Sequence, residues 1–106
     1  MICFCGCGKA AAHSHHVFYA QHLKAHAGRD KHLARQLVKD PRGQVPAGHT
    51  CHFNHHSGAN KYRVSRLPDT ILEFGVEVFG AGKAFNLLER HYLNDDPRLE
   101  ALLGER

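Results

Sequence analysis

From residue 69 onward, apolar residues recur at helical spacing and predict three consecutive helices. We expect Asp69 to cap the first helix, residues 80–82 to interrupt the pattern, and Asp96 followed by Pro97 to begin the last helix. These stripes predict a packed helical core rather than a site. They consist of Ile71, Leu72, Val78 and Phe79, then Ala84, Phe85, Leu88 and Tyr92, and finally Leu99, Leu102 and Leu103.

Upstream of these helices the apolar patterns are shorter and less regular. They predict strands over residues 12–17 and 44–48, which can pair with each other. Gly28 is expected to break the segment between them, and Asp30 to cap a helix over residues 30–38. Strands followed by a helical segment predict an α+β fold.

Length and composition fit one small domain. The chain has 106 residues, of which 42% are hydrophobic, enough for a modest core. We expect a single domain over residues 1–106, with a core over 1–61 and a helical C-terminal extension over 62–106. No apolar run approaches the roughly 18 residues of a membrane helix, and residues 1–9 lack the pattern of a signal peptide. We therefore expect no membrane association and a cytoplasmic compartment, in a bacterium or an infected host cell.

Positive charge is concentrated in the first part of the chain. Residues 1–66 hold ten Lys or Arg and two acidic residues, a net charge of +8. Residues 67–106 hold four Lys or Arg and eight acidic residues, a net charge of −4. Ten of the eleven histidines also lie in the first part. A basic region rich in metal ligands predicts a polyanionic partner, with DNA as the first expectation. A merely solvated basic face is the alternative.

The stretch "GHTCHFNHHSG" concentrates four histidines and one cysteine in eleven positions and predicts a metal site. It reads as a short helix with Thr50 as its N-cap and Gly58 as its stop. His52 and His56 are four residues apart, so both project from one face of that helix. His55 replaces His56 as a ligand if the helix is rotated.

Two further histidines, His15 and His16, are adjacent in the first predicted strand, where neighbouring side chains point to opposite sides. One of the pair can therefore face the metal while the other takes a different role. His49 is expected to be a second-site ligand or to have no role. The remaining histidines are expected on the surface or in packing: His13, His22, His26, His32 and His91.

The four cysteines are predicted to bind a structural zinc ion. Three of them alternate in "CFCGCG", as Cys3, Cys5 and Cys7, and the fourth is Cys51. Cysteines this close together are poor disulfide partners for one another, and a reducing compartment disfavours bridges. Structural zinc is tetrahedral with four protein ligands. Either all four cysteines bind it, or His49 replaces Cys3.

The ordered set "HSHHV…DPRG…TCHFNHHSG" resembles the HNH endonuclease family, especially its small phage and bacterial members. In that family a strand ends in a paired "HH" or "DH", a central Asn follows, and a "CH" opens a helix that carries a final His or Asn four residues on. The motif covers roughly residues 3–58. The segment "RVSRLPDTILEF" is similar, less specifically, to the helical tail of phage HNH proteins.

This resemblance implies a ββα-metal fold and hydrolysis of DNA phosphodiesters with one divalent ion, Mg²⁺, Mn²⁺, Ni²⁺ or Zn²⁺. His16 matches the general base. His15, His52 and His56 match the ligands of the catalytic ion. A setting in phage DNA processing or packaging, with packaging proteins as partners, follows only by family analogy.

Two departures from the family pattern concern a glycine and the cysteines. The central Asn aligns with Gly43, which has no side chain to tie the loop that supports the base. Backbone groups, Asp40 or Asn54 must then substitute. Two C-x-x-C knuckles hold zinc in many HNH proteins. Cys7 and Cys51 match two of their four positions, whereas the other two positions fall on Phe4 and Gly48.

DNA contacts are expected from basic residues around the predicted site, namely Arg42, Lys61, Arg63 and Arg66. The segment between His16 and Gly43 is longer than is usual for the family. We expect it also to contact the DNA backbone through Lys24, Arg29, Lys31, Arg35 and Lys39. Two alternatives to a nuclease stay open. They are a zinc-stabilised DNA-binding module that has lost cleavage, and a zinc-built protein-interaction module.

Overall fold

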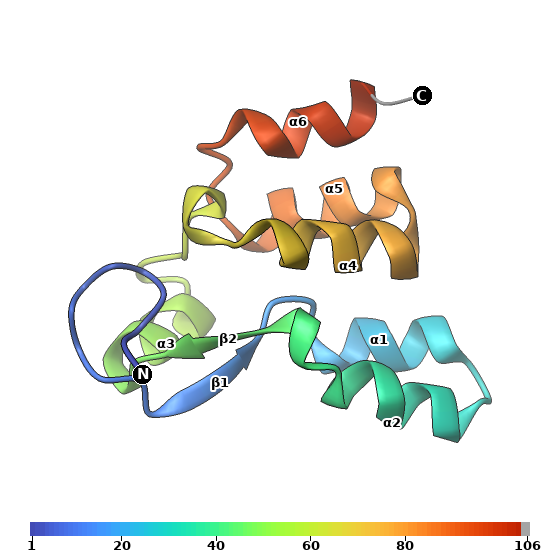
Figure 1. Cartoon of the computed structure of the whole chain (residues 1–106), viewed down its shortest axis with the longest axis horizontal. Helices are drawn as coiled ribbons and strands as arrows, with labels where there is room; N and C mark the ends of the chain where they lie inside the picture. Colours follow the sequence, from blue (N-terminus) through green and yellow to red (C-terminus); the bar gives the residue numbers. More distant parts are fainter. Residues whose placement is uncertain (105–106) are drawn as a thin grey trace.

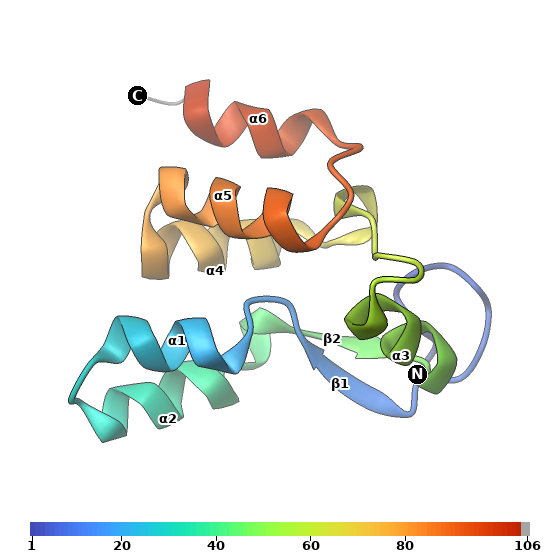
Figure 2. The same cartoon turned by 180° about the vertical axis from the view of Figure 1, so that it is seen from behind.

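The computed structural model of the chain describes residues 1–104 and combines a two-stranded sheet with six α-helices in that part. Figures 1 and 2 show the arrangement from opposite sides. The sheet and α3 lie at one end, the α1–α2 hairpin extends sideways from the sheet, and α4, α5 and α6 are stacked above both. Within residues 1–104, none of the helices has the length and apolar character that crossing a membrane requires.

The predicted strands pair as expected. Strand β1 (His13–His16) runs antiparallel to β2 (Gln44–Ala47), with His15 opposite Val45 and His16 opposite Gln44. Helix α3 (His49–Ser57) follows β2 directly and contacts β1. The chain order is therefore strand, strand, helix, and α3 lies beside the strand that carries the paired histidines.

The boundaries of α3 differ from the prediction at one end. The N-cap is Gly48, with an extended backbone, and Thr50 already lies inside the helix. The prediction that Thr50 caps α3 is therefore wrong. Gly58 does end the helix, with φ of 81° and ψ of 2°, the left-handed conformation that glycine adopts without strain.

Between the strands lies a helical hairpin, α1 (Ala20–Ala27) and α2 (Lys31–Lys39), joined by a short turn in which Gly28 has a positive φ of 62°. Asp30 caps α2 as predicted, because its carboxylate accepts a hydrogen bond from the Leu33 amide at 2.9 Å. A single turn of 3₁₀ helix, η1 (Pro41–Gly43), then leads into β2.

The C-terminal part consists of a short 3₁₀ turn, η2 (Val64–Arg66), followed by α4 (Asp69–Phe79), α5 (Ala81–His91) and α6 (Pro97–Gly104). Asp69 lies in the first turn of α4 and its side chain does not cap the helix, so that part of the prediction is wrong. Only Gly80 interrupts the pattern, because Gly82 lies within α5.

Asp96 caps α6 as predicted, since its carboxylate accepts the Arg98 amide at 2.9 Å. The same carboxylate holds the Arg98 guanidinium, which also donates to the backbone carbonyls of Val64 and Leu67. This network fixes α6 against the segment that precedes α4.

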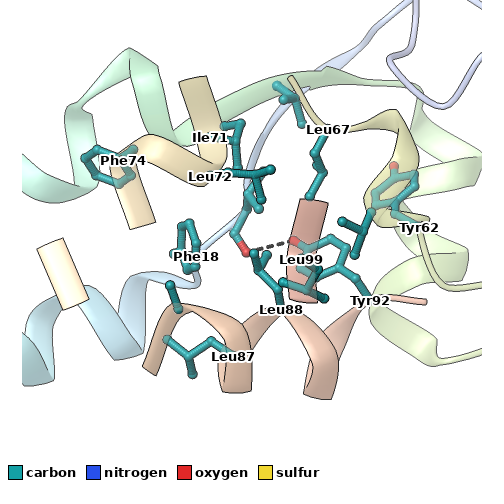
Figure 3. Close-up of a cluster of buried hydrophobic side chains, with 14 of the residues drawn as sticks. Phe18, Tyr62, Leu67, Ile71, Leu72, Phe74, Leu87, Leu88, Tyr92 and Leu99 are labelled. Atoms are coloured by element: carbon teal, nitrogen blue, oxygen red, sulfur yellow. Dashed lines mark hydrogen bonds between the residues drawn. The ribbon is translucent and has the colours of Figure 1, made fainter. Parts of the chain in front are cut away.

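One buried cluster draws side chains from both parts of the chain, and Figure 3 shows its centre. Phe18, just after β1, packs near Phe74 of α4, with 6.3 Å between ring centroids. Leu72, Leu88 and Leu99 come from the three C-terminal helices. Burial of these side chains, each contributing roughly 1.5–3 kcal/mol, holds the C-terminal helices on the strand end that carries the histidines.

Candidate metal centres

Three of the predicted ligands come together in a histidine centre: His15 from β1, and His52 and His56 from α3. One ring nitrogen from each lies within 4.8 Å of the other two. The Nε2 atoms of His52 and His56, one helical turn apart, are 3.0 Å from each other. Two ligands at about 2.1 Å from one ion and at right angles are roughly 3 Å apart, so this spacing suits a shared metal ion.

Burial makes His15 a suitable neutral ligand. Its side chain is only 1% exposed, and its Nδ1 is buried with no hydrogen-bond partner among residues 1–104. Desolvation, followed by the nearby rings of His55 and His52, lowers the pKa of His15 to about 2, so the ring stays neutral. An unsatisfied buried acceptor costs about 1–3 kcal/mol. A bound cation would remove that cost, and imidazole suits the divalent transition metals.

His16 points to the other side of β1, as the alternation of strand side chains predicts. Its Nε2 lies 3.0 Å from the carbonyl oxygen of Val38, near the end of α2. A carbonyl can only accept, so Nε2 carries the ring proton and donates it. The Nδ1 of a neutral His16 therefore has a free lone pair, as a proton acceptor requires.

The loop that supports His16 is held by Gln44, which the sequence reasoning missed. Its amide nitrogen donates to the carbonyls of Val38 at 3.2 Å and Asp40 at 3.4 Å, and its amide oxygen accepts from Ser14 at 2.6 Å. Neither Asp40 nor Asn54 does this with its side chain. The Asp40 carboxylate binds Arg42 instead.

Gly43 has no room for the side chain that the family pattern expects there. A Cβ built on Gly43 would lie 2.7 Å from Cε2 of Phe74, a buried ring of α4. The backbone of Gly43 is used instead, because its carbonyl accepts from the Val17 amide at 3.0 Å just beyond β1. Packing against α4 therefore explains the glycine.

Of the two alternative ligands, His55 and His56, the structure favours His56, because both ring nitrogens of His55 have other partners. Its Nδ1 accepts the Tyr62 amide at 3.0 Å, so its Nε2 carries the proton and lies 2.7 Å from the hydroxyl of Tyr19. The side chain is 3% exposed, and burial, with smaller effects from neighbouring histidines, lowers its pKa to about 4. His55 thus serves as a neutral buried link between α3 and its surroundings.

Other histidines form pairs that were not expected. Nε2 of His13 lies 3.0 Å from Nδ1 of His49, in an exposed position beside the histidine centre. His22 of α1 and His91 of α5 face each other with 3.4 Å between their Nε2 atoms. His26 packs edge-on against a phenylalanine and His32 is exposed, in line with the expected surface and packing roles.

The four cysteines form a second cluster, the cysteine centre, at the end of the N-terminal loop. All four Sγ atoms lie within 4.8 Å of one another. Successive Sγ–Sγ distances are 3.3, 3.5 and 3.7 Å along Cys3, Cys5, Cys51 and Cys7. Four thiolates at about 2.3 Å from one zinc ion would be roughly 3.8 Å apart. The geometry favours the all-cysteine set, since His49 pairs with His13 instead.

Electrostatics in the cysteine centre favour a bound cation. Burial and the neighbouring thiols raise the pKa of Cys5 to about 12, whereas a hydrogen bond from the Lys9 backbone lowers the pKa of the exposed Cys7 to about 7. Four clustered thiols do not all ionise unless a positive charge compensates them. A divalent ion provides that charge and deprotonates coordinating thiols.

The residues predicted to contact DNA differ in whether nearby carboxylates pair with their charged side chains. Lys61, Arg63 and Arg66 are exposed and line one pocket beside the cysteine centre. Arg63 lies 3.9 Å from an Asp95 carboxylate, a loose pair. Arg42 is instead held by Asp40 and Glu77, at 2.9 and 2.6 Å, which neutralise its charge. The structure therefore argues against Arg42 as a DNA contact.

The α1–α2 hairpin gathers basic side chains around an apolar groove. Its lining includes four of the five basic residues expected to contact DNA in this segment: Lys24, Lys31, Arg35 and Lys39. Val38 lines the same groove, and its carbonyl is the one that holds His16. The hairpin is thus both a basic surface and a support for the predicted base.

One tyrosine contacts the histidine centre and two others pack on His55 beside it, and none of the three was predicted to do so. Tyr19 contacts His55, Tyr62 stacks on the same ring, and Tyr92 lies 2.7 Å from Nε2 of His15 through its hydroxyl. Tyr92 was assigned to an apolar stripe. A buried tyrosine hydroxyl usually finds a polar partner, and that tendency was the signal in the sequence.

Comparison with known proteins gives no family assignment. No family model, no curated protein and no solved structure matches the chain. The likeness to the HNH family therefore rests on the motif residues alone. The two clusters and the distribution of charge are the observations from which a function can be inferred.

Proposed function

We propose that this protein is a metal-dependent endonuclease that hydrolyses phosphodiester bonds of DNA. The observation that carries the proposal is the contrast between two adjacent histidines of β1. His15 joins His52 and His56 around one point, whereas His16 points away with its Nδ1 lone pair free. Hydrolysis of a phosphodiester needs a metal ion and a proton acceptor, and these two adjacent residues of β1 are proposed to serve one each.

In the proposed reaction, Nδ1 of His16 accepts a proton from a water molecule. The resulting hydroxide attacks the phosphorus opposite the 3′ oxygen. The bond between phosphorus and that oxygen breaks, and the oxygen takes up a proton from solvent water. The family resemblance implies 5′-phosphate and 3′-hydroxyl products. A divalent ion held by His15, His52 and His56 would neutralise charge on the phosphate and on the leaving oxygen.

Gln44 has a supporting role in this proposal. Its amide donates to the Val38 carbonyl, which also accepts from His16. Gln44 therefore supports the loop that orients the base, the role that the resemblance gives to an Asn at Gly43. The adjacent position in β2 supplies the amide that the crowded glycine position cannot.

We further propose that the cysteine centre holds a structural zinc ion. Four thiolate ligands form the closed tetrahedral set typical of structural sites, whereas three neutral histidines leave coordination positions open for phosphate and water. Cys51 belongs to α3, only one residue before His52. A zinc ion there would fix the N-terminal loop to the start of the helix that carries two catalytic-metal ligands.

DNA is proposed to bind through two basic surfaces. One consists of Lys61, Arg63 and Arg66 beside the cysteine centre, and the other is the groove of the α1–α2 hairpin. Such contacts bind phosphates without reading sequence, and each releases counterions from the duplex. The net charge of +8 over residues 1–66 supports this partner.

The test is cleavage of supercoiled plasmid by the purified protein with Mg²⁺, Mn²⁺, Ni²⁺ or EDTA in turn. We expect nicked or linear DNA only when a divalent ion is present, and loss of cleavage in His52→Ala. The exposed His32→Ala, on α2, is the matched control and should cut normally. Folded protein that binds DNA but cuts it with none of these ions would contradict the proposal.

A zinc-stabilised DNA-binding module without cleavage is the second candidate function. The observation in its favour is Gly43, which lacks the side chain that the family pattern has there. Both functions require binding to DNA, so a binding assay does not distinguish them. Only the nuclease would cleave the plasmid.

A further inference from the structure

Tyr92 connects the C-terminal helices to the histidine centre. It follows the last residue of α5 and is 3% exposed. Its hydroxyl donates to the carbonyl of Val17 at 2.7 Å, the bond dashed in Figure 3, and lies 2.7 Å from Nε2 of His15. These contacts join residues more than 70 positions apart in the sequence.

The directions of these two hydrogen bonds follow from the number of protons available. A tyrosine hydroxyl has one proton, and the Val17 carbonyl can only accept it. The hydroxyl oxygen must then accept from His15, so the ring proton of His15 is on Nε2. The other nitrogen, Nδ1, keeps its lone pair, and it is the buried atom without a partner.

We propose that Tyr92 is a positioning residue that fixes His15 in the Nε2–H tautomer and thereby presents Nδ1 as its metal-binding atom. The inference rests on His15 belonging to the metal site of the proposed function. It identifies Nδ1 of His15 as the metal-binding atom and Tyr92, which lies outside the motif, as the residue that supports it. A metal-bound histidine commonly donates its second ring N–H to a partner that sets its orientation.

The C-terminal extension is therefore part of the metal site as well as part of the core. In free imidazole the proton can reside on either nitrogen. A His15 without the Tyr92 contact would expose its lone pair on the wrong atom for part of the time. Outer partners of this kind typically change metal affinity by roughly 10–100-fold.

The first measurement is the tautomer of His15 in wild-type protein whose cysteine centre is loaded with zinc and whose histidine centre has no metal added. Long-range ¹H–¹⁵N NMR spectra distinguish the protonated from the unprotonated ring nitrogen. We expect the Nε2–H tautomer. An Nδ1–H tautomer would overturn the inference, whatever the variants do.

The second measurement is the affinity for Ni²⁺ of the zinc-loaded protein, by calorimetry, in wild type, Tyr92→Phe and Tyr62→Phe. Tyr62 is the matched control because its buried hydroxyl has no hydrogen-bond partner among residues 1–104. We expect Tyr92→Phe to bind Ni²⁺ roughly 10–100-fold more weakly and to lose the tautomer preference, and Tyr62→Phe to match wild type.

Neither readout involves DNA, so this inference and the proposed nuclease can fail separately. Folded Tyr92→Phe with wild-type affinity and an unchanged tautomer would overturn the inference even if the protein cuts DNA. Weakened binding in Tyr92→Phe alone would support the inference even if no DNA is cut. If Tyr92→Phe does not fold, the tautomer of wild type still decides.

Discussion

At the scale of single residues, the hydrogen-bond partner of each histidine determines what the ring can do. His15, His16 and His55 lie in one small region but differ in which ring nitrogen has a partner. His16 donates to a carbonyl, which leaves Nδ1 free. His55 has both nitrogens occupied. His15 keeps one buried nitrogen without a partner. The sequence could predict the grouping from spacing, but these partners come from distant elements and could not be predicted.

Replacing Gln44 tests the support of the base. Gln44→Ala removes the amide that holds the Val38 carbonyl. We expect plasmid cleavage to slow roughly fivefold to tenfold, because such a hydrogen bond contributes about 1 kcal/mol. Ni²⁺ affinity should not change. Gln36→Ala, an exposed glutamine on α2, is the matched control. Equal cleavage rates for the two variants would show that Gln44 does not support the base.

The buried ring of His55 predicts a specific dependence on pH. Burial lowers its pKa to about 4 in the folded chain, below the ordinary value of 6.5. As the pH falls from 6.5 towards 4, the unfolded chain takes up a proton that the folded chain does not. The free energy of unfolding should fall by up to about 1.4 kcal/mol per pH unit from this group.

An NMR titration of the ring carbons of His55 measures this directly. We expect no change in its resonances between pH 7 and pH 5, and a midpoint near pH 4. A midpoint near 6.5 would mean that the ring is accessible and that its two hydrogen bonds do not persist in solution.

At the scale of elements, local signals predicted some boundaries and failed at others for identifiable reasons. Asp30 and Asp96 cap their helices as expected, since each carboxylate reaches a backbone amide. Thr50 and Asp69 carry the same local signal, but Thr50 is the second residue of α3 and Asp69 the first residue of α4, so neither is at the N-cap. Helix α3 begins directly after β2, so tertiary contact rather than the capping side chain sets its start.

The α1–α2 hairpin gives a prediction for DNA binding at this scale. Lys31→Gln with Arg35→Gln removes two charges from its groove. The slope of log affinity against log salt should become shallower by up to about 1.8, because each neutralised duplex phosphate contributes roughly 0.9. Fluorescence anisotropy in EDTA measures binding without cleavage. Lys83→Gln, on α5 outside the groove, should leave the slope unchanged, and an unchanged slope in the double variant would exclude the groove.

At the scale of the whole molecule, the two parts of the chain depend on each other. The motif and the cysteine spacing predicted seven candidate ligands in the first 58 residues, and the structure brings all seven into two clusters. It did not predict Tyr92, because a tyrosine in an apolar stripe looks like core until its hydroxyl partner is known. The expectation that residues 62–106 only pack as a core is therefore incomplete.

The cysteine centre gives a prediction for the stability of the whole chain. Cys51→Ser should lose the zinc proposed for this centre and lower the melting temperature by more than about 10 °C, because metal binding contributes several kcal/mol to folding. Metal analysis and calorimetry measure both. The control is His56→Ala, five residues after Cys51 on α3, which should retain the zinc. A Cys51→Ser protein that melts like wild type would show that the centre does not stabilise the fold.

The measurement that tests the central claim most directly is the cleavage rate of His16→Ala at saturating divalent ion, with its metal affinity measured in parallel. The account predicts unchanged Ni²⁺ affinity, since His16 points away from His15, His52 and His56, and a loss of cleavage of roughly 10²–10⁴-fold. Wild-type cleavage by His16→Ala would contradict the assignment of the base. A loss of metal binding would place His16 among the ligands instead.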